Sequence, residues 1–285
     1  TFLNWVFIFG NLGAPQLGVE GAALATLLAR VLSCAIAIGW AVMDKNFRID
    51  PALLFRPGGE MIRRFVRFAT PVMCNETFWG LGSSLFPTIM GHMAGSEVIL
   101  AAYAIAGNIT NLCTVGVFAI AGTAAILVGQ EIGLGNADKV YSLGALLDAL
   151  AFLFGLAAGL VFLALLHWFI IPVLYPMFKL SPSAGDICTM MLTMVFCILP
   201  LRSFDTTNIV GVLRGGGDVR TATIIDLAPL WVVAIPLAAL AGLVLQAGIF
   251  WVYLAMMSES IVKSLVGFGR FRTGKWVRDV TVPNF

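Results

Sequence analysis

Long apolar stretches constrain this sequence more than any other feature. With 60% hydrophobic and only 11% charged residues, it has too little polar surface for a water-soluble domain. A bilayer core of about 30 Å is crossed by about 20 helical residues, and lipid offers the backbone no partner outside the helix. The sequence therefore predicts an all-α fold, a polytopic membrane helix bundle. Seven complete spans are predicted near 18–43, 68–92, 98–128, 140–172, 186–213, 221–243 and 246–268.

Basic residues indicate the orientation of this bundle. The loops around Gln16, Gly95, Pro182 and Gln246 hold only Lys179, whereas the alternate loops and the tail hold most of the lysines and arginines. The positive-inside rule predicts that these basic segments, the C-terminus included, lie in the cytoplasm, in a plasma or inner membrane protein. Because the bases are scattered between spans, they favour no nucleic-acid partner.

The chain is predicted to have four parts. Residues 44–67 contain two prolines, a glycine pair and mixed charges, and they separate one and a half spans from six, which is typical of a cytoplasmic linker. Residues 1–13 are apolar but too short to cross a bilayer alone, so we expect the end of a cut helix and a C-terminal part of a longer protein. The predicted parts are 1–43, the remnant of an N-terminal lobe; 44–67, the linker; 68–269, a complete six-helix lobe; and 270–285, a cytoplasmic tail.

Three strings carry a family resemblance. They are LNWVFIFGNLGAPQLGVEGAALAT (3–26), ILVGQEIGLGNADKVY (126–141) and VLRGGGDVR (212–220), followed by Trp231 and Pro236. In this order and on these membrane sides they resemble the multidrug and toxic compound extrusion (MATE) family. The resemblance implies a transporter of twelve helices in two six-helix lobes, monomeric when full length. This chain would hold the end of helix five, helix six, the linker and the C-terminal lobe.

Carboxylates inside the predicted spans are costly and need a reason. Counting 1.5 Å per residue from the cytoplasmic helix ends places Glu76, Asp148, Asp205 and Asp226 about 8 to 12 Å deep, in one layer. They converge on a cavity if their faces turn inward. The alternative for each is a capped or hydrogen-bonded acid near the interface, and this alternative is favoured for Asp148 and Asp226.

Glu76 and its neighbours have the composition of a binding site for an organic cation. Glu76 follows Asn75 and precedes Trp79, so a charge, an amide and an aromatic face lie together. The MATE resemblance implies that acids on the first and fourth helices of this lobe couple transport to a cation, and these acids are Glu76 and Asp205. Asn4, in the first of the three strings, is a candidate contribution from the other lobe, with an interhelical hydrogen bond as the alternative.

Asp205 shares a helical face with Arg202 and Asn208 and follows Pro200. A proline frees backbone carbonyls, and carbonyls with a carboxylate suit a small hard cation. The alternative is an Arg202–Asp205 ion pair that neutralises both charges. The candidate cation and substrate residues are therefore Glu76, Asp205, Asn75, Asn4 and Asn208.

The remaining polar residues favour structural roles. The stripe of Asn108, Asn111 and Thr114 is predicted to form hydrogen bonds between helices, and Glu259 is predicted to pair with Lys263 four residues on. The five cysteines include no CxxC pair, and the two histidines lack partners at metal spacing. The sequence therefore predicts no metal site and no cofactor other than a coupling ion, sodium or proton.

We therefore expect a secondary-active antiporter that exports amphipathic, often cationic drugs or metabolites across the bilayer. A flippase for lipid-linked precursors, which favours a more basic cavity, and a non-transporting membrane protein are the alternatives. An enzyme is disfavoured, since the sequence contains neither HExxH nor GxSxG.

Overall fold

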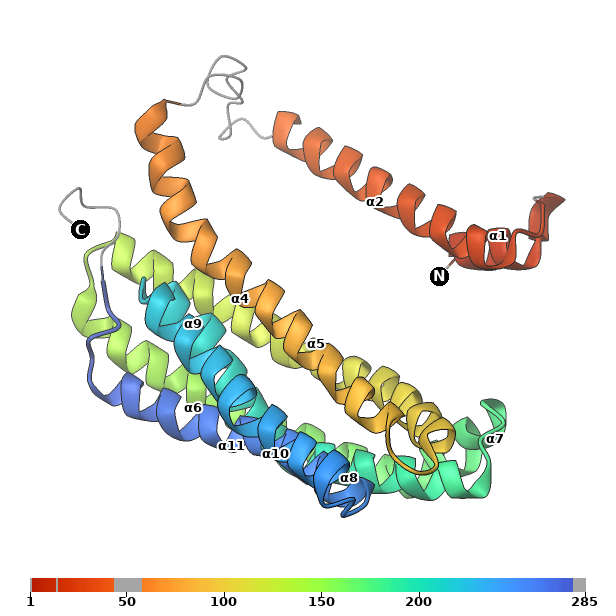
Figure 1. Ribbon diagram of the computed structural model, residues 1–285. Coiled ribbons are helices and arrows are strands. Elements are labelled where there is room, and N and C mark those ends of the chain that lie inside the picture. Colours follow the sequence, from red (N-terminus) through yellow and green to blue (C-terminus); the bar gives the residue numbers. More distant parts are fainter. Residues whose placement is uncertain (1, 14, 44–57, 279–285) are drawn as a thin grey trace. The chain divides into compact units, whose positions relative to one another are not determined.

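The computed structural model describes residues 2–13, 15–43 and 58–278, which are mostly helical and contain no strand (Figure 1). The predicted all-α class is confirmed. The chain divides into two compact units, Thr1–Val66 and Arg67–Phe285, and each is described by itself. Most of the predicted linker, residues 44–57, lies outside the described residues.

The first unit contains helices α1 (Phe2–Phe9) and α2 (Gly18–Met43). The connection between them turns sharply, because Gly10, Gly13 and Gly18 adopt positive φ angles that side chains rarely allow. It brings the Phe7 carbonyl to the start of α2, where it accepts a hydrogen bond of 3.0 Å from the backbone N–H of Leu17. The turn thus packs α1 against the first residues of α2.

The second unit is a bundle of long helices, several of which contain π-helical segments. They are α4 (Gly59–Gly91), which belongs to this unit from Arg67 onward; α5 (Ser96–Gly133); α6 (Ala137–Leu165), continued by η2 (Leu166–Leu174) and α7 (Tyr175–Met177); α8 (Pro182–Thr206), continued by η3 (Thr207–Leu213); α9 (Val219–Ala228), continued by η4 (Pro229–Ala234), α10 (Ile235–Ala239) and η5 (Leu240–Val244); and α11 (Ile249–Arg272).

Six helices among the described residues are long and apolar enough to cross a membrane. They are Gly18–Met43, Ser96–Gly133, Lys139–Met177, Pro182–Leu213, Val219–Val244 and Ile249–Arg272, and each overlaps a predicted span. The other predicted span, 68–92, lies in α4, which has 33 residues but is much less apolar. Polar side chains such as Asn75, Glu76, Ser83 and Ser84 lower its hydropathy, and the site described below explains their presence.

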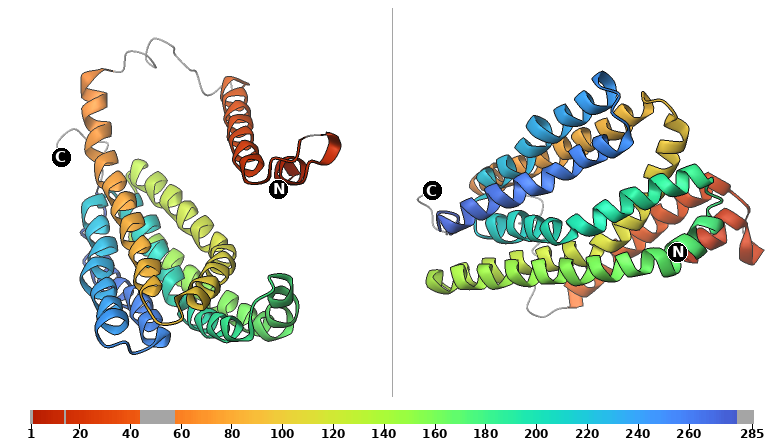
Figure 2. Two further views of the ribbon diagram at one scale, coloured as in Figure 1. Left: turned by 45° about the vertical axis from the view of Figure 1, so that its right-hand side comes forward. Right: turned by 90° about the horizontal axis from the view of Figure 1, so that it is seen from below.

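Helices α6 and α8 lie side by side because two glycines let their backbones approach (Figure 2). A Cβ atom built at Gly155 would lie 2.7 Å from the carbonyl oxygen of Leu199, and one built at Gly159 would lie 2.5 Å from that of Phe196. Both distances are well below van der Waals contact. Small residues spaced four apart are the usual device for close helix contact in membranes.

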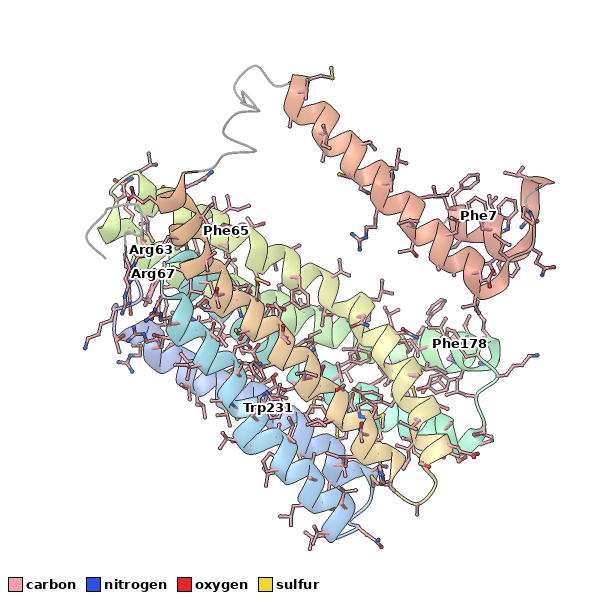
Figure 3. The ribbon with its side chains drawn as sticks, turned by 45° about the horizontal axis from the view of Figure 1, so that its top comes forward. Phe7, Arg63, Phe65, Arg67, Phe178 and Trp231 are labelled. Carbon is pink, nitrogen blue, oxygen red and sulfur yellow. The ribbon has the colours of Figure 1, made fainter. Side chains whose placement is uncertain are left out.

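Helix α4 lies along the α9–η4 segment. Trp231 of η4, labelled in Figure 3, donates its indole N–H to the backbone oxygen of Phe78 at 3.3 Å. The rings of Phe78 and Trp231 also meet edge to face, with centroids 6.3 Å apart. Nearby, Gly82 leaves room for the side chain of Leu230. These contacts position the polar face of α4 beside α9.

The segment after α11 returns to the turn between η3 and α9. The backbone N–H of Arg278 donates to the Gly216 oxygen at 2.8 Å, and Trp276 is completely buried. The turn contains three successive glycines, residues 215–217, and Gly217 adopts a φ angle of 91°. Asp218, also buried, pairs with Arg270 at 2.6 Å. This end of the lobe is therefore closed by packing and an ion pair.

Candidate functional site

A cavity of about 680 Å³ opens inside the second unit, lined by α4, α5, α8, η3, α9, η4 and α11. Its lining combines polar and charged side chains with aromatic and methionine side chains, among them Trp79, Phe86, Phe118, Met256 and Met257. Apolar walls with a few convergent polar groups are typical of a small-molecule site. The positions and partners of the charged groups decide which ligands the cavity can bind.

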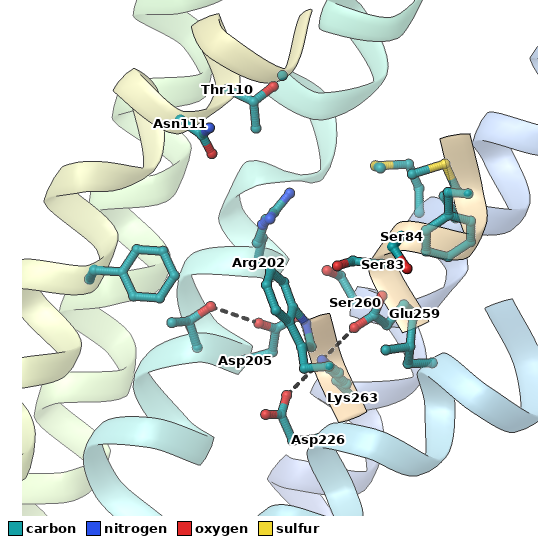
Figure 4. A pocket seen from close by; sticks show the side chains of 18 of the residues that line it. Ser83, Ser84, Thr110, Asn111, Arg202, Asp205, Asp226, Glu259, Ser260 and Lys263 are labelled. Atoms are coloured by element: carbon teal, nitrogen blue, oxygen red, sulfur yellow. Dashed lines mark hydrogen bonds and ion pairs between the residues drawn. The ribbon is translucent and has the colours of Figure 1, made fainter. Parts of the chain in front are cut away.

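Asp226, on α9, lies at the centre of a network of charges. Its Oδ1 is 2.6 Å from the Nζ of Lys263 (Figure 4). Its Oδ2 accepts hydrogen bonds from Asn75 at 2.8 Å and from Arg214 at 3.1 Å. The network joins α4, α9 and α11 to Arg214, the residue that follows η3. With two cations and an amide as partners, Asp226 is already neutralised, which is what a buried carboxylate requires.

Two further carboxylates are paired to the same cations. Glu259 is 2.5 Å from the Nζ of Lys263, so the predicted pair four residues apart on α11 is confirmed. Glu76 is 3.4 Å from the Nη1 of Arg214, and its side chain is 64% exposed. An exposed pair of this kind contributes little, typically below about 1 kcal/mol.

Asp205 differs from the other cavity carboxylates. Its side chain is buried, Oδ1 accepts a hydrogen bond of 3.1 Å from the Thr206 hydroxyl, and Oδ2 has no hydrogen-bond partner. Lys263 and Arg202 act on it electrostatically, but none of the ion pairs among the described residues involves it. The alternative of an Arg202–Asp205 ion pair is therefore not realised in this arrangement.

The predicted site residues separate into three groups. Asn75 and Glu76 on α4 and Asp205 on α8 line the same cavity, so two helices bring these residues together as expected. Asn208 points elsewhere: it is fully buried and donates to Oδ2 of Asp148 on α6 at 2.6 Å. Asn4 belongs to α1 in the first unit, so this lobe alone does not include it.

The predicted layer of four acids is thus three acids at the cavity and one outside it. Asp148 is buried and bound to Asn208, in agreement with the hydrogen-bonded alternative favoured for it. The hydrogen-bonded alternative describes Asp226 only in part, because this carboxylate lies at the centre of the ion-pair network and also lines the cavity. Helix packing decides whether each acid faces the cavity or a neighbouring helix.

Several cavity residues were not predicted. Asn108 and Asn111 line it, so the expectation that they serve only contacts between helices is wrong for both. Thr114, from the same stripe, donates to the Thr110 backbone oxygen of its own helix at 3.0 Å. Lys263 was predicted to pair with Glu259 alone. A lysine inside an apolar span is costly and indicates that carboxylates neutralise it, and the position of Lys263 in such a span could be read from the sequence.

The described residues contain no group of three or more histidine, cysteine, aspartate or glutamate side chains able to hold a metal ion. The cavity contains one carboxylate without an ion pair, Asp205, and it lies near carboxylates that are paired with Lys263 or Arg214. Such a site can take up a proton or a monovalent cation.

The fold and the cavity together define a helical bundle with several candidate membrane spans around a polar cavity. The MatE family model matches residues 71–240, more than half of the chain, so the chain belongs to the MATE family. The resemblance drawn from the three strings is confirmed. The relatives are multidrug efflux transporters rather than enzymes.

Individual relatives agree with this assignment. The probable multidrug resistance protein NorM of Thermotoga maritima is 27% identical over 278 residues, which cover 96% of this chain and 57% of that protein. The MATE transporter ClbM in complex with Rb⁺ has the same fold, with a TM-score of 0.73, 21% identity, and coverage of 96% of this chain and 59% of its own. A MOP superfamily transporter from Pyrococcus furiosus gives a TM-score of 0.79 at 23% identity, with coverage of 98% and 60%. The chain thus spans somewhat more than half the length of these relatives.

Proposed function

We propose that this chain is part of a secondary-active antiporter that exports amphipathic, often cationic organic compounds in exchange for sodium ions or protons. The family, the name of the NorM relative and the mixed apolar and charged lining of the cavity support this proposal. The substrates are small drugs or metabolites, no nucleic acid takes part, and the intact transporter works as a monomer.

The intact transporter has two six-helix lobes in this proposal. Residues 1–43 belong to the N-terminal lobe, 44–67 form the linker, 68–269 form the C-terminal lobe and 270–285 a tail. The distribution of lysines and arginines places the linker and the tail in the cytoplasm, in a plasma or inner membrane. Rocking of the two lobes about the cavity gives alternating access.

Asp205 is the cation-coupling residue in this proposal, and one observation carries the choice. Of the four carboxylates that line the cavity, it alone has a buried oxygen without a partner and no ion pair, whereas Glu76, Asp226 and Glu259 are each paired with Lys263 or Arg214. A bound sodium ion or proton supplies the positive charge that Asp205 lacks. The bound Rb⁺ of ClbM makes a monovalent cation a reasonable ligand in a relative of this fold.

The other candidate residues have supporting roles in this account. Asn75 holds Asp226 in place through a hydrogen bond of 2.8 Å. Glu76 is exposed at the cavity and offers a negative charge to an organic cation, and Trp79 offers an aromatic face. Asn208 fixes the end of α8 through Asp148, and Asn4 contributes from the N-terminal lobe.

The test is substrate export by the intact transporter in liposomes, with sodium and proton gradients applied separately. Asp205→Asn keeps the shape and removes the charge, and we expect it to abolish gradient-driven export. Glu76→Gln should weaken affinity for a cationic dye while export remains coupled. Asp186→Asn is the matched control, because Asp186 is an exposed acid on the same helix outside the cavity. Export by the Asp205→Asn variant at the wild-type rate and with the same ion dependence would contradict the assignment.

A further inference from the structure

Arg202 is a charged cavity residue that the cation site leaves unexplained. It lies on α8, three residues before Asp205, is half-buried and lines the cavity. Among the described residues, its guanidinium forms neither an ion pair nor a hydrogen bond. Lys263 and Arg214, by contrast, each bind two carboxylates. A guanidinium keeps its charge and needs acceptors, and here it faces a cavity.

The residues around this guanidinium supply further donors. In the view of Figure 4, Arg202 extends away from Asp205, toward the side of the cavity where Thr110 and Asn111 lie. The Thr110 hydroxyl is buried, and no hydrogen-bond partner satisfies it, while Asn111 is exposed at the cavity. Tyr103, on the same face of α5, interacts electrostatically with Arg202 and also lines the cavity. One side of the cavity is therefore rich in donors.

The acceptors lie on the other side of the cavity. Asp205 and Glu259 face it from α8 and α11, and the apolar walls formed by Trp79, Phe86 and Met256 lie in the same cavity. A cavity with this distribution matches a molecule with an apolar body, a cationic group and a separate anionic group. A purely cationic compound leaves the Arg202 guanidinium without an acceptor in hydrogen-bond contact, at a cost in desolvation.

We propose that Arg202, with Tyr103, Thr110 and Asn111, forms a second subsite that binds the carboxylate of a zwitterionic amphipathic substrate. An arginine and a carboxylate pair through two parallel hydrogen bonds, which also fixes the orientation of the ligand. The cationic group of the same molecule then lies toward Asp205 and Glu259. This inference rests on the proposed export function and narrows its substrate class.

Rhodamine B and its ethyl ester test the subsite, because they differ in a free carboxylate and share a cationic aromatic body. Binding of each dye to the purified intact transporter is measured by fluorescence polarisation. Wild-type protein should bind the free acid more tightly than the ester. In Arg202→Gln, the Kd of the free acid should rise about 10-fold, as expected for a lost charged hydrogen bond, while the Kd of the ester changes less than about 2-fold.

Two variants complete the test. Arg202→Lys keeps the charge without the planar fork and should restore part of the preference for the free acid. Arg220→Gln removes the same charge from an exposed residue outside the cavity and should leave both Kd values unchanged. Equal effects of Arg202→Gln on both dyes, or no effect on either, overturn the carboxylate subsite while leaving the export proposal intact. If wild-type protein binds neither dye, both proposals fail together.

Discussion

The two faces of helix α8 and its continuation η3 place two equally buried carboxylates in different surroundings. Toward α6, Gly155 and Gly159 bring the backbones into close contact, and Asp148 is bound to Asn208 at 2.6 Å. Toward the cavity, Asp205 is equally buried and accepts a hydrogen bond from Thr206, and each of the two carboxylates keeps one buried oxygen without a hydrogen-bond partner. Burial therefore does not identify a functional acid. What separates the two carboxylates is their surroundings, because Asp205 lines the cavity, whereas Asp148 is bound to Asn208 outside it.

The face toward α6 should be the less tolerant of added volume. Gly159→Leu places a side chain where the Phe196 carbonyl already lies, so the helices must separate. We expect a loss of at least about 3 kcal/mol in the free energy of unfolding, since overpacking beside a rigid backbone is among the costliest core changes. Unfolding of the purified intact transporter in mixed micelles measures this loss.

Gly122→Leu is the matched control for this prediction. Gly122 lies on α5, and a Cβ atom built there meets no atom within 4 Å. Its replacement should cost less than about 1 kcal/mol, because surface substitutions away from packing contacts are usually small. Similar losses in the two variants would show that the α6–α8 contact is not specially close.

On the cavity face, stability depends on neutralising the buried carboxylates, and Lys263 does this for Asp226 and Glu259. Lys263→Met leaves Glu259 without a cation and Asp226 with Arg214 alone. We expect a loss of about 3 kcal/mol in the free energy of unfolding, because breaking a buried pair leaves an uncompensated charge. The same unfolding measurement checks it.

A double variant separates lost charge from lost packing. Lys263→Met combined with Glu259→Gln removes both members of one pair, and part of the lost stability should return. If the stability losses of Lys263→Met and Glu259→Gln simply add in the double variant, the two residues act independently. In that case the network interpretation is wrong.

Asp148→Asn should have the smallest effect. The amide oxygen can still accept the hydrogen bond from Asn208, so the loss is that of a charged bond replaced by a neutral one, about 1 kcal/mol. The ion dependence of export by the intact transporter should be unchanged, because Asp148 lies outside the cavity. An altered ion dependence in this variant would remove the distinction between the two faces of α8.

The sequence predicts the helices of this lobe well, because lipid imposes length and hydropathy on each span. The exception, α4, is less apolar than its neighbours because it carries the cavity residues Asn75 and Glu76. The depth of the acids follows from the fixed rise per residue and stays a prediction. These features depend on local chemistry and need no tertiary information.

The direction in which each polar side chain points is not predictable from local chemistry. Asn208 shares a helical face with Asp205 by spacing alone, but the π-helical turn that starts at Thr207 carries it toward Asp148. Likewise, the link between Lys263 and Asp226 joins residues 37 positions apart, which no spacing rule identifies. Packing between helices decides both.

The most direct test of the account is charge movement on cation binding, without any substrate. Intact transporter in liposomes on a solid-supported membrane is exposed to a sodium jump and, separately, to a proton jump. We predict a transient current on one of these jumps in wild-type protein and in Asp148→Asn, and none in Asp205→Asn. A current of wild-type size in Asp205→Asn, or its loss in Asp148→Asn, would contradict the claim that Asp205 binds the coupling cation.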